Sequence, residues 1–80
     1  MSGRPHIKIT ESVEDLREIL KQQKKILAYN KVQMLYLFQS KQVETVREVS
    51  AVLGKSEATV HRWLFQYKEG GLENLVVINM

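Results

Sequence analysis

The sequence predicts an all-helical domain, a bundle of about four helices. Apolar residues recur at helical spacing in four segments, and Ser or Thr residues suited to capping precede three of them. Helix-breaking residues are nearly absent between residues 12 and 69, where the only glycine is Gly54 and no proline occurs. An 80-residue chain without cysteine predicts a single domain, residues 1–80, whose core forms without a disulfide.

The first helix is expected to begin after Ser12 and to run to about Gln23. Ser12 is a good N-cap, and Asp15 follows at the spacing of a capping box. The apolar stripe consists of Val13, Leu16, Ile19 and Leu20. Residues 1–10 are expected to be flexible, although residues 6–10 alternate polar and apolar like a short strand.

The second helix is predicted around Val32–Phe38, with Asn30 as its cap. Its residues are apolar around most of the helix, which places it in the centre of the domain. A buried strand is the alternative, but the flanking glutamines and the lack of β-branched residues at positions 34–38 favour a helix. Residues 40–44 are expected to form a loop.

Two further helices follow, separated by a short turn. Thr45 and Glu48 form a capping-box pattern at the start of the third helix, and Gly54 ends it. Ser56 caps the fourth helix, which ends at the glycines of positions 70 and 71. The inward stripes are expected to be Val46, Val49, Ser50 and Leu53, then Val60, Trp63, Leu64 and Tyr67.

This arrangement predicts a helix-turn-helix unit over about residues 45–69. Only Gly54 and Lys55 separate Leu53 from the next cap, so the two helices must cross sharply and pack closely. Ser50 is small enough to lie where they touch. In such units the second helix enters the major groove of DNA, so double-stranded DNA is the predicted partner.

The outward face of the fourth helix supplies the candidate base contacts. Arg62 can donate twice to guanine, and Gln66 can make the equivalent contact with adenine. His61 can donate or accept, and Glu57 can accept from cytosine. Phosphate contacts are expected from Lys55, Ser56, Thr59, Thr45 and Arg47. Each of these residues is also explained as an ordinary solvated or capping residue.

The remaining apolar residues leave alternatives open. Trp63 and Tyr67 are expected in the core rather than on bases. Phe65 lies on the outer side of its helix, where it either touches a thymine methyl group or packs on the apolar tail; we favour the tail. The tail, residues 72–80, either folds back on the core, adds a strand, or pairs with a second chain to form a homodimer.

The charge distribution is mildly basic, with a formal net charge of +3. Residues 1–20 carry −1 and residues 21–80 carry +4, so we assign the basic excess to the C-terminal helices, where it fits a phosphate-binding surface. An ordinary solvated surface explains it nearly as well. The longest apolar run, Met34–Phe38, is too short to span a membrane, and no signal peptide is visible. A cytoplasmic, nucleoid-associated protein is therefore expected.

The chain resembles the N-terminal DNA-binding domain of bacterial insertion-sequence transposases of the mariner-like superfamily, which are common in cyanobacteria. The resemblance extends over about residues 6–75, and its lead-in covers Ile9–Lys24. Its strongest segments are Val32–Phe38, Val46–Gly54 and Thr59–Leu72. The most specific pattern is Val60-x-x-Trp63-x-x-x-Tyr67-x-x-Gly70-Gly71-Leu72.

The resemblance implies a homeodomain-like domain that reads the terminal inverted repeats of a mobile element. Ser50 stands where relatives often have alanine. In that family a catalytic domain with three metal-binding carboxylates follows, whereas Asp15 is the only aspartate here. We therefore expect no enzymatic activity, no metal, no cofactor and no small-molecule substrate. The chain is expected to be a remnant, a first reading frame with a separately encoded catalytic polypeptide, or a fragment. A transcriptional repressor and a helical dimerisation module are the alternatives.

Overall fold

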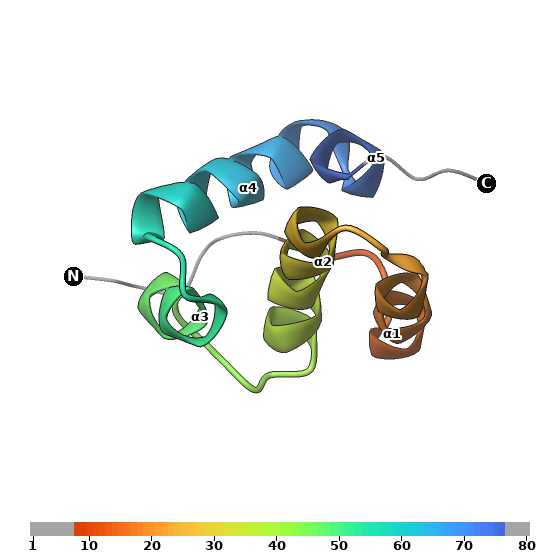
Figure 1. Ribbon diagram of the computed structural model, residues 1–80, viewed down its shortest axis with the longest axis horizontal. Coiled ribbons are helices and arrows are strands. Elements are labelled where there is room, and N and C mark those ends of the chain that lie inside the picture. The colour runs from red at the N-terminus through yellow and green to blue at the C-terminus, as the bar shows by residue number, and fades with distance from the viewer. Residues whose placement is uncertain (1–7, 77–80) are drawn as a thin grey trace.

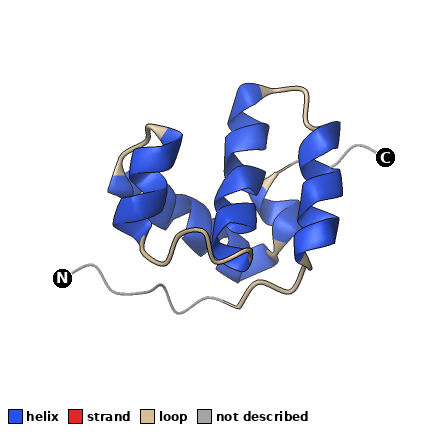
Figure 2. Ribbon diagram, turned by 90° about the horizontal axis from the view of Figure 1, so that it is seen from below, coloured by secondary structure: helices blue, strands red, loops and turns tan. Residues whose placement is uncertain are grey.

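The computed structural model describes residues 8–76, and these residues form five helices (Figure 1). Helices α1 and α2 lie side by side and antiparallel, and α4 lies across α2 and α3 (Figures 1 and 2). The helices are α1 Val13–Gln22, α2 Ile26–Gln39, α3 Val46–Leu53, α4 Glu57–Gly70 and α5 Leu72–Leu75. The described residues contain no strand, so the strand-like alternatives left open for the two ends do not occur there; residues 1–7 and 77–80 lie outside the described part.

Three helices begin at the predicted caps. The Ser12 side chain accepts from the backbone N–H of Asp15, and the Ser56 side chain accepts from that of Thr59. At α3 the capping box is complete, because Thr45 accepts from the Glu48 backbone and the Glu48 side chain accepts from the Thr45 backbone. Each cap satisfies a backbone donor that the helix itself leaves without a partner.

Helix α2 begins at Ile26, before its predicted cap at Asn30. Lys25 is the N-cap and makes no side-chain capping bond, and Asn30 lies inside the helix, so the Asn30 cap is wrong. No capping residue marks this start. The helix is held instead by core burial, which involves Val32, Met34, Leu35 and Leu37.

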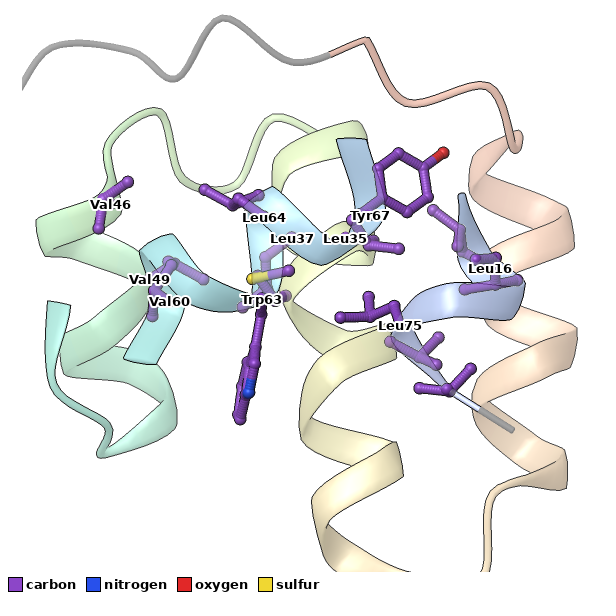
Figure 3. Close-up of a cluster of buried hydrophobic side chains, with 14 of the residues drawn as sticks. Leu16, Leu35, Leu37, Val46, Val49, Val60, Trp63, Leu64, Tyr67 and Leu75 are labelled. Carbon is purple, nitrogen blue, oxygen red and sulfur yellow. The ribbon is translucent and has the colours of Figure 1, made fainter. Parts of the chain in front are cut away.

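One hydrophobic core joins the helices (Figure 3). The inward stripe of α4, Val60, Trp63, Leu64 and Tyr67, is buried as predicted. Trp63 is only 4% exposed, and the Nζ atom of Lys31 on α2 lies 5.8 Å from the centroid of its ring. Helix α1 contributes Leu16 to the same core, where this side chain is fully buried.

The described part of the C-terminal tail folds back on the core. Leu72, Leu75 and Val76 are buried, and Lys31 Nζ donates to the Leu75 carbonyl oxygen at 3.2 Å. Of the three alternatives for the tail, folding back is therefore confirmed for residues 72–76. The turn into α5 needs its glycines: Gly71 has φ +74°, and a Cβ on Gly70 would lie 2.5 Å from the Asn74 Cβ.

The segment before α1 is also attached to the core, over residues 9–11. The Tyr67 hydroxyl donates to Glu11 Oε1 and accepts from the Thr10 backbone N–H at 3.1 Å. Gln39 Nε2 donates to the carbonyl oxygens of Ile9 and Glu11 at 3.2 and 2.6 Å. Flexibility was predicted for residues 1–10, but Ile9 packs on the core and Thr10 is bonded to α4.

Candidate nucleic-acid interface

The turn between α3 and α4 has the geometry that a helix-turn-helix unit requires. Gly54 adopts the left-handed conformation, with φ 69° and ψ 31°. The backbone N–H groups of Gly54 and Lys55 both donate to the Ser50 carbonyl oxygen, which closes the last turn of α3. Ser50 is buried, and its hydroxyl donates to the Arg47 carbonyl oxygen at 2.9 Å. Only three residues, 54–56, therefore separate the two helices, and α4 crosses α3 at a sharp angle (Figure 1).

Helix α4 divides into a buried face and an exposed face. The buried stripe consists of Val60, Trp63, Leu64 and Tyr67. At about 100° per residue, Phe65 points nearly opposite to this stripe. The exposed residues of α4 surround that direction. Apart from Gly70 at the end of the helix, they are Glu57, Ala58, His61, Arg62, Phe65, Lys68 and Glu69.

Three of the four predicted base-contacting residues lie on this exposed face. His61 and Arg62 are adjacent in the second turn of α4, and Glu57 is the first residue of the helix. All three side chains are exposed, so their polar atoms can reach a ligand lying along α4. Glu57 also lies where the helix dipole favours an anion.

The fourth predicted residue, Gln66, lies at the edge of the exposed face. It is half-buried, and its Oε1 atom is out of contact with solvent, with no hydrogen-bond partner among the described residues. Its backbone carbonyl oxygen accepts from Asn74 Nδ2 at 2.7 Å. In this position the Gln66 amide is less available for a bidentate contact with adenine than the exposed Arg62 is for guanine.

The start of α3 is occupied by a carboxylate. Glu48 Oε1 accepts from the backbone N–H groups of Glu44 and Thr45 and from the Thr45 hydroxyl, all within 3.0–3.1 Å. These bonds lower the pKa of Glu48, the bond from the Glu44 backbone most strongly. The donors predicted to bind a phosphate at this helix start are therefore already hydrogen-bonded to Glu48. The only cationic residue predicted to contact phosphate there is Arg47, which is exposed.

The predicted phosphate contacts before α4 take part in its cap. Ser56 Oγ and Thr59 Oγ1 lie 3.0 Å apart in a hydrogen bond, and Ser56 Oγ also accepts from the Thr59 backbone. Ser56 is exposed, whereas Thr59 and Lys55 are half-buried. The helix start thus brings these three residues together beside the second turn of α4.

Phe65 does not pack on the described part of the apolar tail, residues 72–76. Its side chain is 61% exposed, while the buried residues Leu72, Leu75 and Val76 belong to the core. The preference for the tail is therefore wrong within the described residues. The reason is the turn at Gly71, after which α5 contacts the core rather than the outer face of α4.

A family model of the homeodomain-like domain matches residues 26–76, well over half of the chain. The chain belongs to this family. It is a DNA-binding helix-turn-helix family that is also found in transposases. Searches of curated proteins and of solved structures found no match.

The homeodomain-like unit covers α2, α3, α4 and α5, and α1 precedes it. Helix α1 packs along α2, and the contact of Tyr67 with Glu11 links the segment before α1 to α4. Burial raises the pKa of Tyr67, and the hydrogen bond to Glu11 raises it further. Sequence patterns gave no sign of this link, because its two residues are 56 positions apart.

The basic excess does not lie where we assigned it. The helix-turn-helix segment 44–69 contains four basic and four acidic residues and is formally neutral. The surplus lies instead in residues 21–41, which contain five lysines and no acidic residue; three of these lysines, Lys21, Lys24 and Lys25, lie close to the turn between α1 and α2. The helix-turn-helix segment therefore carries single, separated charges of both signs rather than a strongly basic face.

Two further features of the described residues are relevant to function. No helix among them is long and apolar enough to cross a membrane. No group of three or more histidine, aspartate or glutamate residues is arranged there to hold a metal ion.

Proposed function

We propose that this chain binds double-stranded DNA sequence-specifically, with α4 in the major groove. The observation that carries the proposal is the division of α4. Four core residues fix one face of the helix, and the opposite face presents His61 and Arg62 to solvent in its N-terminal half. A helix held in this way can enter the groove, which is wide enough for a helix, without losing its core.

The residues that we assign to DNA contacts have distinct roles in this proposal. Arg62 donates to O6 and N7 of a guanine, and His61 contacts a neighbouring base edge. Arg47 and Lys55 neutralise phosphates on the strands that flank α4, and Ser56 donates its hydroxyl to a phosphate oxygen. Gln66 contributes only if its half-buried amide turns outward, and Glu57 accepts from cytosine or serves the helix start alone.

The resemblance to insertion-sequence transposases supports a more specific role. The chain reads the terminal inverted repeats of a mobile element and leaves strand cleavage to a catalytic polypeptide or domain. A small transcriptional repressor would use the same surface. Such a protein acts at the nucleoid in the cytoplasm.

A fluorescence-anisotropy titration tests the DNA-binding proposal. A labelled mixed-sequence duplex is titrated at several salt concentrations, and a duplex selected from a random pool is titrated beside it. We expect affinity that falls as salt rises, because phosphate contacts release counterions, and tighter binding of the selected duplex. Undetectable binding at low salt, or enrichment of no sequence, contradicts the proposal.

A second candidate function is self-association through the first turn of α2. Ile26 is 79% exposed and Leu27 54% exposed, and Tyr29, which is also exposed, lies one turn after Ile26. Such a group of apolar side chains is typical of a contact with another protein. Sedimentation equilibrium of the wild type and of an Ile26→Ser/Leu27→Ser variant tests it. If the mass is that of a monomer in both, self-association through this turn is excluded.

A further inference from the structure

Phe65 is a large apolar side chain on the face of α4 that we place in DNA. It is 61% exposed, and its direction is almost opposite to that of the buried stripe of this helix. Its neighbours on this face are polar or charged apart from Ala58. A solitary exposed ring among charged residues is too small a surface for a stable dimer, which needs several hundred square ångströms from each partner.

The ring lies close to the residues that we assign to base contacts. Phe65 follows His61 by four residues and Arg62 by three, so all three lie on the same side of the helix in successive turns. Long side chains on a helix lean towards its N-terminus, so the Phe65 ring covers the turn that carries His61 and Arg62. A ligand that contacts Arg62 along α4 therefore also meets the Phe65 ring.

The major groove offers one apolar group on its base edges, the C5 methyl group of thymine. We infer that Phe65 is a specificity-determining residue that packs on a thymine methyl group next to the guanine contacted by Arg62. The inference rests on the proposed DNA-binding function. Arg62 and Phe65 are about 4.5 Å apart along the helix axis, and base pairs are about 3.4 Å apart. The thymine therefore belongs to the base pair one or two steps from that guanine.

Replacing thymine by uracil removes this methyl group and leaves the hydrogen-bonding pattern of the base pair unchanged. A duplex selected from a random pool by the full chain is resynthesised with each thymine replaced by uracil in turn. The affinities of the wild type and of Phe65→Ala are then measured for every duplex. Phe65 is exposed, so its truncation leaves the fold intact, and a circular dichroism melt of each variant checks this.

We expect one thymine, within two base pairs of a guanine, at which uracil lowers the wild-type affinity about fourfold, the value of one buried methylene-sized group. Phe65→Ala should bind both duplexes equally weakly, because the two changes remove the same contact. The inference is overturned if the wild type tolerates every uracil, if Phe65→Ala retains the preference for thymine, or if the selected sequence has no thymine near a guanine. Failure to select any sequence overturns the proposed function instead.

Discussion

The two faces of α4 serve different purposes, core packing on one and contact with solvent on the other, although their residues alternate within the same 14 positions. The buried face consists of Val60, Trp63, Leu64 and Tyr67, and each of these side chains packs in a core shared by all five helices. The exposed face presents His61, Arg62 and Phe65 to solvent. Substitution on the first face should therefore change stability, and substitution on the second should change DNA binding alone.

The comparison is sharpest between the adjacent residues Arg62 and Trp63. They differ by one position in sequence and by about 100° around the helix. One is exposed, and the other is 4% exposed beneath the Lys31 side chain. Our assignment of function to α4 depends on these two residues having separate effects.

Trp63→Ala should have the largest effect. Truncation of a buried tryptophan costs about 3–5 kcal/mol, whereas a domain of this size is stable by only about 0.05–0.15 kcal/mol per residue. We expect the midpoint of a circular dichroism melt to fall by about 12–40 °C, and DNA binding to be lost at temperatures where the variant is unfolded. Trp63→Phe should retain much of the stability. A Trp63→Ala domain that melts at the wild-type temperature would show that the helix is oriented differently.

Arg62→Ala should leave the melting temperature unchanged and weaken binding to the selected duplex. A bidentate contact with guanine contributes about 1–3 kcal/mol, so the affinity should fall about 5- to 150-fold and the preference for that guanine should disappear. Lys24→Ala is the charge-matched control on the turn between α1 and α2. If the two variants lose the same affinity with the same sequence preference, Arg62 acts only as a charge.

Gly54→Ala tests the turn that joins the two helices of the motif. A Cβ at this position would meet nothing within 4 Å, so the cost comes from the positive φ alone. We expect a loss of about 1–2 kcal/mol in the free energy of unfolding. Gly54→Asn should lose less, because asparagine tolerates the left-handed conformation. Equal losses in urea titrations of the two variants would contradict this explanation.

The capping box of α3 should give the smallest effect, and one that depends on pH. The pKa of Glu48 is lowered from its ordinary value of 4.5 by hydrogen bonds to the Glu44 backbone and to Thr45. Its contribution to stability is therefore present above pH 4.5 and is lost as the pH falls through the lowered pKa. The difference in melting temperature between the wild type and Glu48→Gln should be largest near neutral pH and should close in acid. A difference that does not change with pH would contradict this role of the carboxylate.

Local patterns predicted most of the fold. Ser12, Thr45 and Ser56 set the starts of three helices, and Gly54 ended α3, because these signals act within a few residues. The start of α2 was missed because Lys25 makes no capping bond. The one-turn helix α5 was missed because four residues are too few to show a helical period.

The candidate site was predicted less completely than the fold. The exposed positions of His61 and Arg62 followed from the period of the buried stripe. The half-buried state of Gln66 and the exposure of Phe65 depend on where α5 packs after Gly71, which is a tertiary contact. The bond between Tyr67 and Glu11 likewise joins distant parts of the sequence.

The central claim is that the exposed face of α4 is the surface that contacts DNA. Chemical-shift mapping of the ¹⁵N-labelled chain, titrated with the selected duplex, tests it most directly. We predict that the largest shifts occur at Ala58, His61, Arg62 and Phe65, with smaller shifts at Arg47 and Lys55. If the largest shifts instead occur at Ile26, Leu27 and Tyr29 while α4 is unchanged, the DNA lies elsewhere and our account of α4 is wrong.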